Sequence, residues 1–178
     1  ASPVGDERDK AVTFREIRSY VIREGRMSPG QRRALIEYWP QYGLNLADGK
    51  VDPVRIFTND HPLVLEIGFG MGDSLLEMAA AEPATNFIGI EVHRPGVGHL
   101  LINASEAGLT NLRVFNADSK DVVEQCIVDA CLDRIQVFFP DPWHKKRHHK
   151  RRLIALPFVQ LLREKLKPNG VLHIATDW

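Results

Sequence analysis

From Leu63 onward, short apolar runs alternate with longer stretches of helical periodicity, and this alternation restricts the fold more than any other feature of the chain. The predicted strands are residues 63–67, 87–90, 112–115, 135–139 and 171–175. The predicted helices are residues 73–81, 96–107, 119–130 and 156–166, the last closed by residues 167–170. Because a helix separates each strand from the next, we expect an α/β fold with a doubly wound, mostly parallel sheet and helices on both faces.

The residues before this alternation have a different character. Ser28 followed by Pro29 is typical of the start of a helix, which we expect to end at Pro40. Residues 43–60 contain Gly, Asn, Asp and Pro, and they predict an irregular connection.

Charge is distributed unevenly, although the formal net charge of the chain is zero. Residues 1–59 carry 10 basic and 8 acidic side chains, residues 60–139 carry 4 and 12, and residues 140–178 carry 9 and 3. This pattern favours a polyanionic partner held by the flanks, and a solvated surface is the alternative.

We divide the chain into a basic N-terminal extension with a helix, residues 1–60, and a main domain, residues 61–178. Such a domain normally continues with further strands, so we expect it to be C-terminally incomplete, with one exposed sheet edge.

The composition narrows the class of protein. Apolar residues make up 44% of the chain, enough for one core, and no stretch approaches the roughly 20 apolar residues that span a bilayer. We expect no secretory leader and no membrane association. Cys126 and Cys131 are predicted to be thiols that form neither a disulfide nor a metal site, which favours the cytoplasm.

A glycine-rich turn follows the first strand of the main domain. It contains Gly68, Gly70 and Gly72, with Glu66 before it and Asp73 after it. The glycines permit a tight turn in which a ligand approaches backbone N–H groups. A dinucleotide fingerprint requires glycine where Asp73 stands, and the two carboxylates would repel a pyrophosphate. The pattern instead resembles the first motif of S-adenosylmethionine-dependent methyltransferases, whose cofactor carries an amine and a sulfonium.

Acidic residues also follow the next two strands. Glu91 is placed to accept hydrogen bonds from both ribose hydroxyls of a nucleoside cofactor, and Asp118, which follows Asn116, is placed to reach the adenine. A helix N-cap is the alternative reading for each carboxylate taken alone. Three acids at successive strand ends favour a ligand crevice, because the carboxyl ends of parallel strands meet at one edge of the sheet.

Residues 138–152 combine an acid, an indole and a basic run. Asp141 lies between Pro140 and Pro142, Trp143 follows, and six Lys or Arg residues lie between positions 144 and 152. The indole either stacks on a base or packs the loop, and the basic run either binds phosphates or forms a solvated loop. The histidines in this run lack the spacing of a zinc site, so we expect no metal.

Together these motifs resemble the bacterial tRNA (guanine-N7-)-methyltransferase family. The resemblance is carried by residues 66–72, 89–91, 116–118, 139–148 and 176–178, and it covers nearly the whole chain from about residue 17. It implies a Rossmann-like methyltransferase domain in which a methyl group passes from S-adenosylmethionine to N7 of guanine 46 in the variable loop of tRNA. A Thr-x-Phe-Glu-like element of the family lies beyond the end of this chain.

The resemblance also implies roles for individual residues. The cofactor is expected to contact Glu66, Gly68, Gly70, Gly72, Glu91, Asn116, Asp118 and Asp141. Asp141 is the expected catalytic residue, and the expected tRNA contacts are Lys145, Arg147, Lys150, Arg151, Arg152 and Asp177. A monomer is favoured. The arginines before residue 27 either close over the cofactor, track the tRNA or form an exposed helix.

Two other functions remain open at the level of sequence. Residues 141–143 loosely resemble the Asp-Pro-Pro-aromatic segment of exocyclic-amine methyltransferases. A non-catalytic RNA-binding protein on a methyltransferase scaffold is the other alternative, although the intact glycines and acids argue against it. A nicotinamide dehydrogenase is disfavoured because the third glycine of its fingerprint is missing.

Overall fold

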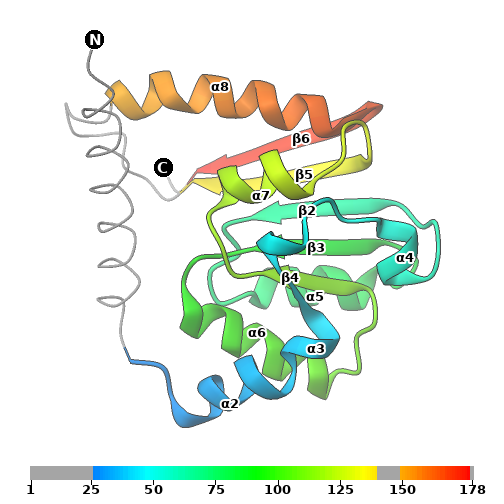
Figure 1. Cartoon of the computed structure of the whole chain (residues 1–178), viewed down its shortest axis with the longest axis vertical. Coiled ribbons are helices and arrows are strands. Elements are labelled where there is room, and N and C mark those ends of the chain that lie inside the picture. The colour runs from blue at the N-terminus through cyan, green and yellow to red at the C-terminus, as the bar shows by residue number, and fades with distance from the viewer. Residues whose placement is uncertain (1–25, 140–148, 177–178) are drawn as a thin grey trace.

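The sheet is the centre of the molecule. The structure, a computed structural model, describes residues 26–139 and 149–176. Six strands lie in the order β1-β4-β3-β2-β5-β6, and the five neighbouring pairs are parallel (Figure 1). The strands are β1 (Gly43–Leu44), β2 (Leu63–Ile67), β3 (Asn86–Ile90), β4 (Leu112–Phe115), β5 (Leu132–Phe139) and β6 (Leu166–Thr176). The predicted doubly wound α/β fold is confirmed.

Helices cover both faces of this sheet (Figure 1). One face carries α2 (Pro29–Glu37), α3 (Trp39–Tyr42), α5 (Asp73–Ala81) and α6 (Arg94–Glu106). The other carries the short 3-10 helix η1 (Leu46–Asp48), α4 (Pro53–Phe57), α7 (Ser119–Cys126) and α8 (His149–Lys165). Each face buries its own apolar cluster, so the sheet is apolar on both sides, as parallel sheets generally are.

Strand β2 shows how side chains are divided between the two faces. Leu63, Leu65 and Ile67 belong to the cluster under α7 and α8, whereas Val64 belongs to the cluster under α5 and α6. Side chains alternate along a strand, so Glu66 lies on the same face as Val64. A carboxylate thus lies on the face covered by α5 and α6, near the carboxyl end of a central strand.

The residues before β2 differ from the prediction. Pro40 does not end a helix, because α2 ends at Glu37 and Pro40 lies in the first turn of α3, where a missing N–H costs nothing. Residues 43–60 are not irregular throughout: they contain β1, η1 and α4. Gly43 starts β1 directly beneath Trp39, where a Cβ would collide with the indole.

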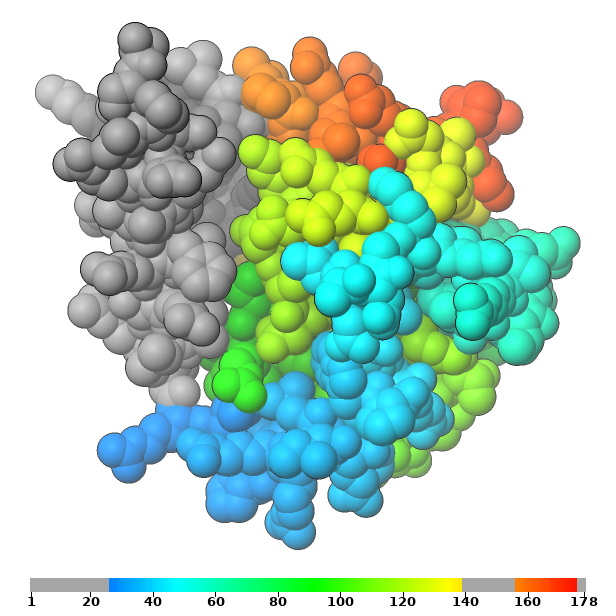
Figure 2. Space-filling view, in the orientation of Figure 1, coloured from blue at the N-terminus to red at the C-terminus, as the bar shows by residue number. Residues whose placement is uncertain are grey.

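These N-terminal residues pack onto the sheet and its helices. Helix α2 contacts α6, and β1 pairs with β4 at one edge of the sheet. In the space-filling view the blue and cyan atoms of this region lie against the green and yellow atoms of later elements (Figure 2). The division of the chain at residue 60 stays a prediction.

The C-terminal boundaries also differ from the prediction. Helix α8 begins at His149 and continues through Pro157, and α7 ends at Cys126. Strand β6 begins at Leu166, so residues 167–170 belong to the strand and not to a turn. The pairing of β5 with β6 shifts register after Leu132, and this irregularity accommodates the segment. Both cysteines are free thiols, as predicted.

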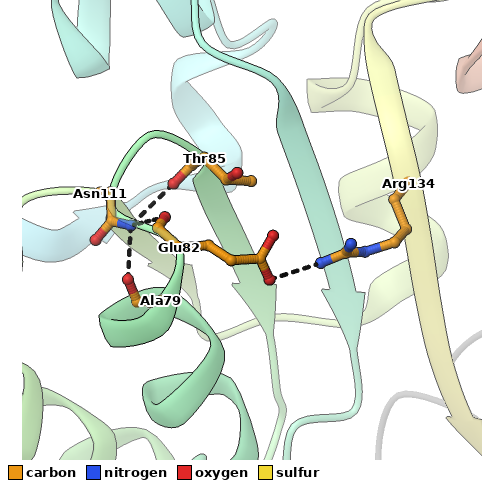
Figure 3. Close-up of polar contacts among 5 residues, drawn as sticks. All are labelled: Ala79, Glu82, Thr85, Asn111 and Arg134. Atoms are coloured by element: carbon orange, nitrogen blue, oxygen red, sulfur yellow. Dashed lines mark hydrogen bonds and ion pairs between the residues drawn. The ribbon is translucent and has the colours of Figure 1, made fainter.

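The side chains of Asn111 and Glu82 fix the end of α5 near the sheet (Figure 3). Asn111 donates from Nδ2 to the carbonyl oxygens of Ala79, Glu82 and Thr85 at 2.9–3.1 Å. The side chain of Glu82 pairs with Arg134 on β5, with 3.3 Å between Oε2 and Nη2. The helix end is therefore tied to β5 as well as to the loop before β4.

Within the described ranges, no helix combines the length and the apolar character needed to cross a membrane.

Candidate active site

The glycine-rich turn after β2 adopts the conformation that its glycines predict. Gly68, Gly70 and Gly72 have φ angles of 77°, 63° and 83°, in the left-handed region that glycine populates easily. The N–H of Gly68 donates to the carbonyl of Ile90 at the end of β3, at 2.8 Å. A Cβ on Gly72 would lie 2.9 Å from the side chain of Leu100 on α6. The turn is thus a close-packed connection from β2 into α5.

Glu91 holds this turn from the end of β3. Its Oε1 accepts from the N–H of Gly70 at 2.7 Å, and its Oε2 accepts from the N–H of His93 at 2.9 Å. A carboxylate oxygen has further lone pairs, so both oxygens keep acceptor capacity. The predicted glycine turn and Glu91 are therefore in contact. The expected contact of Glu91 with the ribose stays a prediction.

Asn116 and Asp118 lie just beyond β4. Asn116 donates from Nδ2 to the carbonyls of Glu91 and Val92 at 2.9 and 3.2 Å, so it positions the backbone that carries Glu91. Asp118 is the N-cap of α7, and its Oδ1 accepts from the N–H groups of Lys120 and Asp121. The capping alternative for Asp118 is therefore realised, and its adenine contact stays a prediction.

Glu66 has one carboxylate oxygen that is left without a hydrogen-bond partner. Its Oε2 is buried and has no hydrogen-bond donor. Burial raises the pKa of Glu66 from the ordinary 4.5 to about 7, and the positive charge of Arg134 opposes that rise. A buried acceptor near the carboxyl end of the central strand fits a ligand that brings both a donor and a positive charge, as the amine of S-adenosylmethionine does.

Comparisons with known proteins identify the family. A family model described as "Putative methyltransferase" matches residues 60–178. The tRNA (guanine-N(7)-)-methyltransferase of Marinobacter nauticus is 56% identical over 167 residues, covering 94% of this chain and 70% of that protein. The protein of the same name from Stutzerimonas stutzeri is 54% identical over 177 residues, covering 99% of this chain and 74% of that protein. The chain belongs to the tRNA (guanine-N7-)-methyltransferase family.

Solved structures of lower identity agree on the fold. A structure named "Structure of an antibiotic related Methyltransferase" has a TM-score of 0.52 and 15% identity, covering 72% of this chain and 65% of that one. The 16S rRNA methyltransferase KamB gives 0.51 and 14%, covering 86% of this chain and 60% of that one. At these identities the likeness concerns the methyltransferase fold alone.

Several residues that the family resemblance singles out lie outside the described residues: Asp141, Trp143, Lys145, Arg147 and Asp177. Lys150, Arg151 and Arg152 lie in α8, where the backbone alone is described. The described chain before this segment is β5, which ends at Phe139 and pairs with β2, the strand that carries Glu66.

Three residues beside the glycine turn or Glu66 were not predicted from the sequence. Gly96 packs so closely against the glycine turn that a Cβ would meet the carbonyl oxygen of Gly70. Arg134 and Gln136 place polar side chains on β5, on the face that Glu66 shares. Arg134 and Gln136 could have been found from the sequence, because they alternate with apolar residues in a segment that otherwise resembles a fully buried strand. Among residues 26–139 and 149–176, no group of acids, histidines and cysteines is arranged to hold a metal ion.

Proposed function

We propose that this protein transfers a methyl group from S-adenosylmethionine to N7 of guanine 46 in the variable loop of tRNA. The observation that carries the proposal is the 54–57% identity, over 92–99% of the chain, to proteins named tRNA (guanine-N(7)-)-methyltransferase. The glycine turn and its acids provide a site at the edge of the sheet where parallel α/β proteins bind ligands.

For the cofactor, we propose a cradle formed by the turn and the strand ends. The backbone of Gly68, Gly70 and Gly72 lets the cofactor approach closely, and Glu91 accepts from its ribose hydroxyls while holding the turn. Asn116 keeps the Glu91 backbone in place. Asp118 contributes an acceptor for the adenine from the oxygen that does not cap α7. Because the cofactor is a cation, a site rich in carboxylates attracts it.

For catalysis, we propose that Asp141 orients guanine and stabilises its developing charge. N7 has a lone pair and no proton, so no base is needed. The cofactor supplies the methyl group. As the N7–carbon bond forms, the carbon–sulfur bond breaks with its electron pair going to sulfur, and the purine becomes cationic. Asp141 accepts from the N1–H and amino group of guanine. Positioning of this kind contributes on the order of 7–11 kcal/mol in favourable cases, with electrostatic stabilisation in addition.

For the tRNA, we propose that Lys145 and Asp177 contact the substrate and that the basic run binds phosphates. Arg147, Lys150, Arg151 and Arg152 belong to that run. Six phosphate contacts would give a log–log salt dependence of binding with a slope of roughly −4 to −5. We propose a monomeric, metal-independent enzyme of the cytoplasm.

The test is mass spectrometry of nucleosides from tRNA incubated with enzyme and S-adenosylmethionine. We expect 7-methylguanosine from a tRNA with guanine at position 46 and none when that base is adenine. Aniline cleavage at the methylated base checks the site, because amino-methylated guanine resists it. Asp141→Ala should abolish methyl transfer while S-adenosylhomocysteine still binds, and the exposed Asp60→Ala is the matched control. Methylation at another atom, or full activity of Asp141→Ala, would contradict the proposal.

A further inference from the structure

Three polar atoms are buried without hydrogen-bond partners on neighbouring positions of β2 and β5. They are Oε2 of Glu66, Oε1 of Gln136 and Nε of Arg134. Glu66 is directly opposite Gln136 in the parallel pairing, and Val64 is opposite Arg134. Register partners and positions two apart share a face of the sheet, so all three side chains lie on the face covered by α5. Buried polar groups are rarely left unpaired, which indicates a missing partner.

The topology of the sheet makes this a place for a ligand. From β2 the chain runs outward through β3 and β4, and it then returns to β5 on the other side of β2. The strand order therefore reverses between β2 and β5. In open parallel sheets, ligands bind at the carboxyl ends of the strands at such a switch point. Glu66 and Gln136 lie on the two strands that flank it.

The surrounding residues limit which groups can reach these atoms. On the β3 side, the position opposite Glu66 is Gly89, and the space above it is filled by Leu75 and Phe69. On the β5 side, the Arg134 guanidinium reaches toward α5, where Nη2 pairs with Glu82 (Figure 3). Thus Gln136 is the polar side chain directly beside Glu66.

We propose that Gln136 is a further cofactor-binding residue, which receives with Glu66 the charged amino group of the amino-acid part of S-adenosylmethionine. This inference rests on the proposed function. An ammonium group has three donors and a positive charge, so one group satisfies the carboxylate and the amide oxygen together. Arg134 has no acceptor atom and so does not bind the ammonium group. Because Arg134 pairs with Glu82, the carboxylate of Glu66 remains able to pair with the ligand.

A buried water is the other group that would satisfy the same atoms, because it donates twice and accepts once from Nε of Arg134. A water would make Gln136 a structural residue. The two cases differ in what they predict for ligands with and without the amino-acid part. S-adenosylhomocysteine carries that part, and 5′-methylthioadenosine does not.

The test is calorimetric binding of both ligands to the wild type and to Gln136→Met, which keeps the side-chain length without polar atoms. We expect S-adenosylhomocysteine to bind about tenfold more weakly to the variant, as for a lost hydrogen bond to a charged group. The affinity for 5′-methylthioadenosine should stay within about twofold by the same reasoning. Gln125→Met, at an exposed position of α7, is the matched control.

A second measurement serves if Gln136→Met fails to fold. In wild-type protein with glutamine labelled by nitrogen-15, S-adenosylhomocysteine should shift the Gln136 side-chain amide signal and 5′-methylthioadenosine should not. Equal weakening of both ligands, an unchanged affinity for S-adenosylhomocysteine, or an amide shift common to both ligands would overturn the inference. Failure of the wild type to bind S-adenosylhomocysteine would instead refute the cofactor assignment itself.

Discussion

The burial of Glu66 predicts that the ligand-free protein is stabilised when this carboxylate is neutralised. Burial raises its pKa from 4.5 to about 7, so the folded state holds the proton more tightly than the unfolded state does. The stability that comes from this proton is fully present below pH 4.5 and is lost as the pH rises through about 7. Glu66→Gln replaces the ionisable group by a neutral one of similar shape and should remove this dependence.

The size of the effect follows from the pKa. The difference between 4.5 and about 7 corresponds to about 3 kcal/mol of unfolding free energy. The side chain is not fully buried, so we expect about 2 kcal/mol to be measured. At pH 8 the Glu66→Gln variant should therefore be about 2 kcal/mol more stable than the wild type, whereas at pH 4.5 the two should be equal.

Urea unfolding of wild type and variant across this pH range measures the difference. Other titrating groups are shared by the two proteins and cancel when their stabilities are subtracted. Glu77→Gln, at an exposed position of α5, is the matched control for replacing a carboxylate by an amide. A Glu66→Gln stability difference that stays constant from pH 4.5 to pH 8 would refute the reasoning, because it would mean that Glu66 ionises normally in the folded protein.

Three further outcomes are expected. Gly96→Ala should weaken S-adenosylhomocysteine binding at least tenfold by calorimetry, because the new methyl group would displace the Gly70 carbonyl. The control is Gly30→Ala in α2, where the added methyl group meets no backbone atom and binding should be unchanged. Asn111→Ala should lower the unfolding free energy by about 2–3 kcal/mol in urea, since three carbonyls lose their donor; a loss under 0.5 kcal/mol would contradict this. Asp118→Asn should keep the helix cap, and thus the melting temperature, but weaken cofactor binding because an NH2 donor replaces the oxygen proposed to accept from adenine. Asp118→Ala should in addition cost about 1 kcal/mol of stability.

Much of the fold follows from the sequence because parallel strands buried on both faces leave a strong local signal. The bounds of β2 and β4 are predicted to the residue, and α5 begins and ends where its periodicity does. β1 is missed because two residues carry no periodicity, and its place depends on pairing with β4, which is distant in sequence. The end of a helix at Pro40 is predicted wrongly because proline is unfavourable inside a helix but acceptable in its first turn.

The candidate site is predictable as a set of residues but not as a set of contacts. Sequence places Glu66, Glu91 and Asp118 at strand ends, and the structure shows three different environments for them. Glu91 binds the glycine turn, Asp118 caps a helix and Glu66 has a buried oxygen without a partner. Gln136 is recognised as a neighbour of Glu66 only from the strand register, because no local sequence pattern predicts that β2 pairs with β5.

The charges near the ends of β2 and β5 affect the stability of the protein and its proposed cofactor binding in opposite directions, and both effects act through Glu66. The positive charge of Arg134 is shared with Glu82, to which it is directly bound, so it only partly compensates Glu66. The carboxylate therefore lowers the stability of the ligand-free protein, and under the proposed function the cationic cofactor would supply the missing compensation. S-adenosylmethionine carries two positive charges, one on the amino group of its amino-acid part and one on its sulfur. On the proposed function, a neutral residue at position 66 would give a more stable protein with a weaker cofactor site, which is the trade-off expected where binding takes precedence over stability.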